Sequence, residues 1–443
     1  MSDRYIARAR AAKAAAAADI TKEADEVEAM ATFFNRTGGK DCWSNKWGWW
    51  NKSRKLDEYS GVRVDANGKV AEVMLSFNGL NSTPDANQTD GNDWGTGLNG
   101  LRFLQSLNIH GNRMEGSFSD SMDSACTLTR GDQFMKRQYH FENLRNIDVC
   151  RNGLTGPFPE ALCSVATLEW LNFSRNRLKG SLPDNLSQLK SLKLLDLSYN
   201  HFTGGLPLRG LRTLWKLQAM NLSHNDFTGK LSPDFSRLTS LVVLNCCDNT
   251  FTGKIPKNLS TLSDLKKLDL QTNSLTGNLE EEMLEGLTSL TQLSLTDNSL
   301  TGPMPDSLSC LSELRTLQLG TNQITGMLPV DILGTLSQTL RLLDISENSV
   351  MITELEGQFF RKQFPDYCKI LMDNPNKSVG PPKSEERDGD EKKDDDEGFD
   401  LPVVEDTAAV AASENAEVGG GEEGGQPQDD GNWASYQTEG AGG

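Results

Sequence analysis

The chain has 443 residues, of which 36% are hydrophobic and 24% are charged. This composition fits a soluble protein with a sizeable core, and no stretch approaches the roughly 20 apolar residues of a membrane span. The net charge of −18 argues against nucleic-acid binding. The acidity is concentrated in residues 383–443, where 19 acidic and 4 basic residues give −15 and leave −3 for the rest.

Residues 1–34 begin with an alanine-rich, basic stretch, for which we predict an exposed helix. An organelle transit peptide is the alternative, but the acidic run between residues 23 and 28 argues against it, because such peptides avoid acids. No apolar run here is long enough for the core of a secretory signal. We interpret residues 35–100 as an N-terminal cap with a degenerate first repeat.

Residues 101–350 contain about ten copies of one pattern, L-x-x-L-x-L-x-x-N-x-L-x-G-x-L-P, as in residues 168–183. A fixed period predicts a solenoid, in which each repeat buries its apolar face against its neighbours and the two ends need caps. We expect the recurrent asparagine to bond backbone groups at a turn and the glycine to supply a tight return, so both are scaffold residues. Nine of these asparagines lie 24 to 26 residues apart: Asn152, Asn176, Asn200, Asn225, Asn249, Asn273, Asn298, Asn322 and Asn348.

The second half of the unit, as in Phe-Thr-Gly-Lys-Ile-Pro at 251–256, resembles the plant-type leucine-rich repeat, and residues 29–43 resemble the N-terminal cap of such arrays. The resemblance covers about residues 104–350. It implies an α/β repeat fold, a curved, right-twisted leucine-rich-repeat solenoid whose concave parallel β-sheet recognises proteins, peptides or glycans. It implies no catalysis, and we expect no kinase domain in this chain. The cysteine pair that secreted relatives carry late in this cap is missing from the aligned residues 55–64.

Eight cysteines show neither a paired cap spacing nor a CxxC suited to zinc, which indicates reduced thiols. We therefore predict a cytoplasmic protein, with a secreted one as the less favoured alternative. The four histidines, His110, His140, His201 and His224, are scattered along the chain and suggest no metal cluster. We expect no metal and no other cofactor.

Longer spacings near the front predict two insertions, at residues 83–97 and within 119–141. Residues 351–375 form a closing cap, because Phe359, Phe360 and Phe364 can cover the last open repeat. Residues 376–443 contain too few apolar side chains to offset the entropy of ordering, so we predict a disordered acidic tail.

Strand alternation sends the third, fifth and seventh residues of each repeat to the concave face. Four successive third positions are apolar, which predicts an exposed stripe: Trp170, Leu194, Ala219 and Val243. The fifth positions form a polar ladder. Its side chains either bind a polar ligand or satisfy one another's hydrogen-bonding groups. Our hypothesis is that a partner-binding surface is formed by Trp170, Leu194, Tyr199, Val243, His224 and Asp196. The alternative is that these side chains pack on one another without a partner.

The leading functional interpretation is a non-enzymatic interaction module that binds a protein or peptide on its concave face. One alternative is a secreted or surface protein that recognises ligands in defence or signalling, like plant-type receptors or inhibitors. Another is a regulator of a partner enzyme, by analogy of layout alone. The sequence names neither the partner nor the oligomeric state.

Overall fold

The computed structural model describes residues 26–46, 49, 55–81, 95–98, 100–124, 126–130, 135–139, 141, 143–207, 210–365 and 367–372. The chain divides into two units, Met1–Arg387 and Asp388–Gly443. All of the second unit lies outside the described residues. The predicted acidic tail, the first 25 residues and most of the first insertion lie outside them as well.

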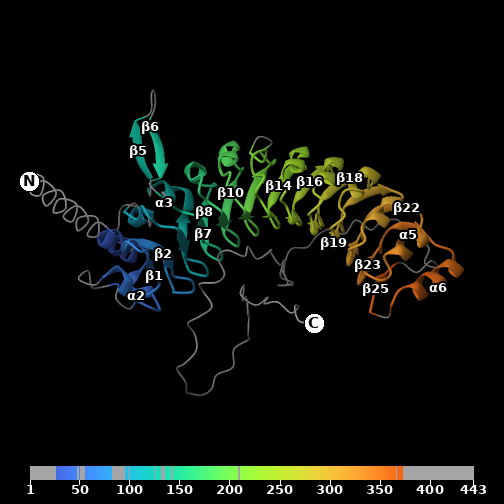
Figure 1. Ribbon diagram of the computed structural model, residues 1–443, viewed down its shortest axis with the longest axis horizontal. Coiled ribbons are helices and arrows are strands. Elements are labelled where there is room, and N and C mark those ends of the chain that lie inside the picture. The colour runs from blue at the N-terminus through green and yellow to red at the C-terminus, as the bar shows by residue number, and fades with distance from the viewer. Residues whose placement is uncertain are drawn as a thin grey trace, which may run out of the picture. The chain divides into compact units, whose positions relative to one another are not determined.

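Two long sheets run through the repeat array, one of 13 strands and one of 10 (Figure 1). We call the 13-stranded sheet the concave sheet. It is parallel except between β1 and β2, and its neighbouring strands pair in register, for example Leu194 with Ala219. Its strands, in spatial order, are β1 Val62–Val64, β2 Val70–Met74, β3 Ser106–Asn108, β7 Asn146–Asp148, β9 Trp170–Asn172, β11 Leu194–Asp196, β13 Ala219–Asn221, β15 Val243–Asn245, β17 Lys267–Asp269, β19 Gln292–Ser294, β21 Thr316–Gln318, β23 Leu342–Asp344 and β25 Lys369–Leu371.

The 10-stranded sheet was not predicted, because the Thr-Gly half of each repeat reads as a turn. Its glycines have left-handed backbone angles, with φ of +77° at Gly204, and they lie at or near the ends of short parallel strands. These strands are β4 Glu115–Ser117, β8 Gly153–Gly156, β10 Arg177–Gly180, β12 His201–Gly204, β14 Asp226–Lys230, β16 Thr250–Gly253, β18 Ser274–Gly277, β20 Ser299–Gly302, β22 Gln323–Met327 and β24 Ser349–Met351.

The return segments between the sheets form single turns of helix, and a proline commonly precedes them, as Pro183 precedes η4. The 3-10 turns are η1 Leu56–Glu58, η2 Gly95–Leu98, η3 Glu160–Ser164, η4 Asp184–Gln188, η5 Pro233–Arg237, η6 Lys257–Thr261 and η7 Asp306–Cys310. The α-helices are α2 Gly39–Cys42, α3 Phe118–Ser124, α4 Glu281–Leu284, α5 Val330–Thr335 and α6 Glu354–Gln363, together with a helical segment at 26–36.

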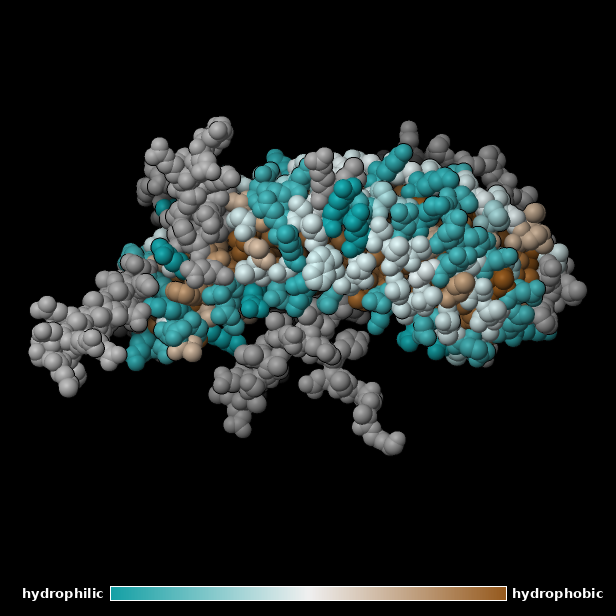
Figure 2. Space-filling view, turned by 45° about the horizontal axis from the view of Figure 1, so that its top comes forward, coloured by the Kyte–Doolittle hydropathy of each residue, from teal (hydrophilic) through white to brown (hydrophobic). Residues whose placement is uncertain are grey.

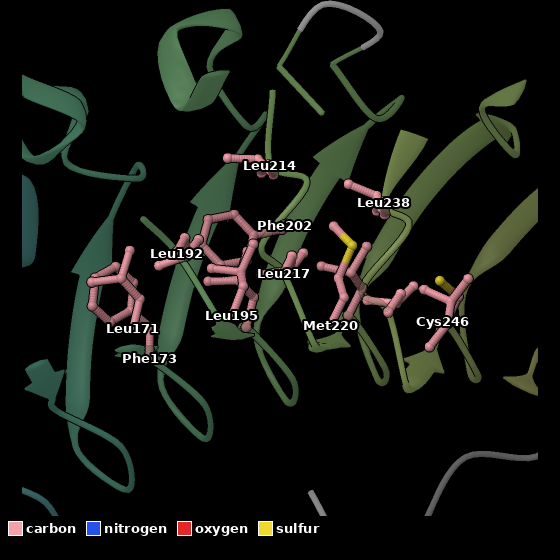
Figure 3. Close-up of a cluster of buried hydrophobic side chains, with 14 of the residues drawn as sticks. Leu171, Phe173, Leu192, Leu195, Phe202, Leu214, Leu217, Met220, Leu238 and Cys246 are labelled. Atoms are coloured by element: carbon pink, nitrogen blue, oxygen red, sulfur yellow. The ribbon is translucent and has the colours of Figure 1, made fainter. Parts of the chain in front are cut away.

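The core is one continuous column of leucine and phenylalanine side chains between the two sheets (Figure 3). Leu171 and Leu195 come from adjacent concave strands and are fully buried. Phe202, Phe227 and Phe251 stack in successive repeats, with ring centroids 6.1 Å apart and planes 10° apart. Each repeat therefore completes its core only through its neighbours, as the period predicts.

The recurrent asparagine has the scaffold role predicted for it. The Asn200 Nδ2 group donates to the carbonyl oxygens of Phe173, Leu197 and Ser198 at 2.9 to 3.1 Å. Its Oδ1 accepts the backbone N–H of Leu178 at 2.9 Å. The same set of bonds recurs in the neighbouring repeats. One buried side chain thus joins each repeat to the one before it.

Aromatic rings pack against one another in the N-terminal cap. Trp43 packs edge-on against Phe34 and Trp49, with centroids 4.9 and 4.6 Å away, and Trp49 packs against Tyr59 at 5.3 Å. The indole N–H of Trp49 donates to the Ser60 carbonyl. These contacts close the cap while Cys42 remains a free thiol.

The second insertion is a helix followed by a hairpin. After α3, strands β5 Cys126–Arg130 and β6 Met135–Tyr139 pair antiparallel and project from the array (Figure 1). At the other end, α6 covers the last repeats through buried Phe360 and Phe364, whose rings are 4.9 Å apart. The burial of these two side chains agrees with a closing role for residues 351–375, which stays a prediction, and the side chain of Phe359 lies outside the described residues.

Replacing Asn200 with alanine should lower the free energy of unfolding by about 3 kcal/mol, because it leaves the buried Leu178 N–H without its acceptor and removes three bonds to backbone carbonyls. Urea unfolding of the full chain measures the change. Asn258→Ala, an exposed asparagine on η6, is the matched control and should cost less than about 0.5 kcal/mol. Equal losses for the two variants would refute the scaffold role.

Candidate functional site: a row of side chains at the ends of the concave strands

The residue before each recurrent asparagine adopts a left-handed conformation, although none of them from Arg151 onwards is glycine. The backbone angle φ is +54° at Arg175, +53° at Tyr199 and +52° at His224. Such angles are unfavourable for L-residues and persist only where surrounding bonds fix them. Here the asparagine amide provides those bonds through the carbonyls of the turn. The backbone at the eighth position of each repeat is therefore fixed, whereas the type of side chain there varies between repeats.

At the eighth position of four successive repeats, the side chains contact one another. We call Arg175, Tyr199, His224 and Asp248 the eighth-position row. The Arg175 guanidinium lies 4.4 Å above the Tyr199 ring, and the Tyr199 ring stacks on the His224 imidazole with centroids 4.0 Å apart. His224 Nδ1 lies 3.4 Å from Asp248 Oδ2. The row thus runs from a cation through two rings to an acid.

The row combines two predicted site residues with two that sequence reasoning missed. Tyr199 and His224 were predicted, and Tyr199 is 38% exposed. Arg175 and Asp248 occupy the same left-handed position of their repeats but were not included in the predicted surface. The available signal was the period itself, since residues 24 or 25 apart occupy the same position in adjacent repeats.

The predicted apolar stripe does not face water as a whole. Leu194, Ala219 and Val243 keep only 1 to 3% of their surface exposed, and of the four only Trp170 is half-buried. The prediction that Leu194 and Val243 present exposed surface is wrong. In-register pairing sets each of these side chains directly beside the same position of its neighbours, and the larger ones flank the small Ala219.

The polar ladder at the fifth position bonds the turn that follows each strand. Asp196 Oδ1 accepts both the backbone N–H of Ser198 at 2.9 Å and its hydroxyl at 2.7 Å. Asn172 and Asn221 make the same pair of bonds in the adjacent strands. Asp196 therefore has a local structural role and is buried, which contradicts its predicted exposure on the partner-binding surface.

Burial shapes the acid–base behaviour of this ladder. Desolvation raises the pKa of Asp196 to about 6, with a further contribution from the Asp148 carboxylate, against the bonds from Ser198. Desolvation likewise raises the pKa of Asp269 to about 6, helped by the charge of Asp248. The concave sheet therefore holds carboxyl groups that resist ionisation.

The expectation that the histidines belong to no metal-type cluster is also wrong for the described residues. His224 lies with Cys247 and Asp248, and His110 lies with Asp148 and Cys150. Each group takes its members from successive repeats, so their distance along the sequence hid their proximity. Seven cysteines in the described part of the chain carry free thiols, as predicted: Cys42, Cys150, Cys163, Cys246, Cys247, Cys310 and Cys368.

Family comparison agrees with this architecture. One leucine-rich repeat model matches residues 142–202 and 263–324, and a second matches residues 216–238 and 240–262. The chain contains leucine-rich repeats. A search of curated proteins finds no match to its sequence.

Two solved plant proteins share the fold of these leucine-rich repeats. The plant peptide hormone receptor RGFR1 in complex with RGF2 is 29% identical, with a TM-score of 0.52, over 58% of this chain and 38% of the receptor chain. This chain thus spans less than half of that receptor. A plant ice-binding protein is 20% identical, with a TM-score of 0.59, over 74% of this chain and 96% of that protein; at this identity the likeness shows the fold alone.

On the face displayed in Figure 2, hydrophilic side chains predominate and apolar ones are scattered among them. Every helix in the described part of the chain is too short or too polar to span a bilayer.

Asp196→Asn should stabilise the protein at pH 8 by about 1–3 kcal/mol, because an amide makes the same bonds without the cost of a buried charge. The folded-state pKa is raised, so stability of the parent protein falls as pH rises from about 4 to about 6. The difference in unfolding free energy between the variant and the parent protein should therefore grow as pH rises from about 4 to about 6, and it should vanish below about pH 4. Urea unfolding at several pH values measures this.

Asp344→Asn is the matched control, since Asp344 makes the same two bonds in the last repeat but is only half-buried. Its stabilisation should be clearly smaller. A destabilising Asp196→Asn, or a pH-independent effect, would contradict the assignment of burial as the cause.

Proposed function

We propose that this protein is a non-enzymatic binding module that holds a protein or peptide partner against its concave sheet. The observation that carries the proposal is the eighth-position row, with Arg175, Tyr199, His224 and Asp248 in contact across four repeats. Tyrosine and arginine are the side chains that most often dominate protein interfaces. Their backbone is already fixed in the left-handed conformation, which reduces the entropy lost when a partner binds.

The surface proposed here is narrower than the one expected from the sequence. Trp170 is half-buried on the first strand of the apolar stripe and can contact a partner, whereas Leu194 and Val243, on the second and fourth strands of the stripe, are buried. Charged side chains at the second position border the same strands: Glu169 pairs with Arg145 at 2.9 Å and with Lys193 at 2.8 Å. An extended peptide lying across the strands would touch successive repeats between these second-position charges and the eighth-position row.

The comparison with a receptor solved in complex with RGF2 supports a peptide as the class of partner. It also favours the secreted or cell-surface alternative for this chain, and the cytoplasmic prediction gains no support from it. A role as regulator of a partner enzyme stays a prediction, because no feature of the described residues favours it over direct recognition.

The double variant Trp170→Ala with Tyr199→Ala should reduce recovery of cross-linked partners from cells at least tenfold, since an interface anchor contributes about 2 kcal/mol or more. Both side chains are partly exposed, so the thermal midpoint should change little. Quantitative mass spectrometry after cross-linking to the tagged full chain measures recovery.

Trp215→Ala is the matched control, because Trp215 is 53% exposed in the turn before β13, outside the concave sheet. It should leave the same set of partners intact. Unchanged recovery by the double variant, or an equal loss with Trp215→Ala, would refute the proposed surface.

A further inference from the structure

Three side chains with metal-binding atoms converge at the acidic end of the eighth-position row. His224 follows β13, and Cys247 and Asp248 follow β15 in the next repeat. Their ligand atoms all lie within 4.8 Å of one another, and His224 Nδ1 is 3.4 Å from Asp248 Oδ2. Ligands of one tetrahedral zinc ion, with bonds of about 2.0 to 2.3 Å, are about 3.3 to 3.8 Å apart. Two of the atoms thus already have this spacing.

The types of ligand atom in this group favour some metal ions over others. An imidazole nitrogen, a thiolate and a carboxylate oxygen together suit Zn²⁺, whereas Ca²⁺ and Mg²⁺ prefer oxygen ligands alone. We propose that His224, Cys247 and Asp248 form a zinc-binding site in the turns that follow β13 and β15, with the fourth coordination position open to water. The site does not depend on the proposed partner.

The scaffold fixes these ligands before any ion arrives. The Cys247 backbone N–H donates to Asn245 Oδ1 at 2.9 Å, and its carbonyl accepts from Asn249 Nδ2 at 2.9 Å. The Tyr199 ring lies 20° from parallel to the His224 imidazole and restricts its rotation. Groups that orient the ligands in this way strengthen metal binding by limiting what must be ordered.

Access and charge at the site are both suitable for a cation. The side chains of His224 and Asp248 are each 34% exposed, whereas Cys247 is 4% exposed beneath them. The Asp269 carboxylate of the next repeat also interacts electrostatically with Asp248. A divalent cation would therefore enter from solvent into a region of negative potential and displace the proton of the thiol.

The second group, His110, Asp148 and Cys150, provides an internal comparison. Its histidine–carboxylate distance is longer, 3.9 Å between His110 Nδ1 and Asp148 Oδ2. The His110 ring also contacts Phe77, with centroids 4.5 Å apart. We expect metal affinity to depend on Cys247 and not on Cys150.

Titration of the reduced, full-length protein with Co²⁺, followed by displacement with Zn²⁺, tests the proposal. The parent protein should develop the absorption of thiolate-bound tetrahedral cobalt, and Zn²⁺ should abolish it. Cys247→Ser should remove this absorption. His224→Gln, which changes a half-exposed side chain, should weaken Zn²⁺ binding at least ~100-fold while the circular dichroism spectrum shows the variant folded.

Cys310→Ser and Cys150→Ser are the controls, the first for an exposed thiol on η7 and the second for the other group. Both should keep the absorption of the parent protein. The proposal is overturned if no thiolate absorption appears, if it survives both Cys247→Ser and His224→Gln, or if either control abolishes it.

Discussion

At the end of the concave strand in successive repeats, an asparagine amide bonds backbone groups of its own turn and of the repeat before it. In Asn200 these groups are three carbonyls and one N–H, shared between its own repeat and the one before. Without them the left-handed residue at the eighth position would be unfavourable and the turn would expose buried polar groups. Register, turn shape and the neighbour relation of the repeats all follow from this side chain.

The candidate site is a consequence of that fixed register. Residues about 24 positions apart become neighbours, so Arg175, Tyr199, His224 and Asp248 contact in sequence order although no two are close along the chain. The turn restricts only the backbone of the eighth residue, which leaves its side chain free to vary. Side chains that could bind a ligand therefore occur at the eighth position, where the repeat fixes the backbone but not the residue type.

The sequence predicted the features that repeat. The solenoid and the scaffold role of the asparagines depend on a periodic pattern, and the burial of Phe360 depends on a bulky apolar residue after the last repeat. The second sheet was missed because short strands that contain Thr-Gly have the composition of turns. The burial of Leu194 was missed because alternation gives the face of a side chain but not what stands beside it. The grouping of His224 with Cys247 needed the three-dimensional register.

Hydrogen–deuterium exchange of individual amides tests the central claim, that the asparagine bonds hold the array, most directly. The amides of Leu178, Phe202 and Phe227 each donate to an asparagine Oδ1 in the following repeat. They should exchange only through global unfolding, at the rate of the slowest concave-strand amides. Exchange as fast as that of the helical turns η4 and η5 would contradict the account.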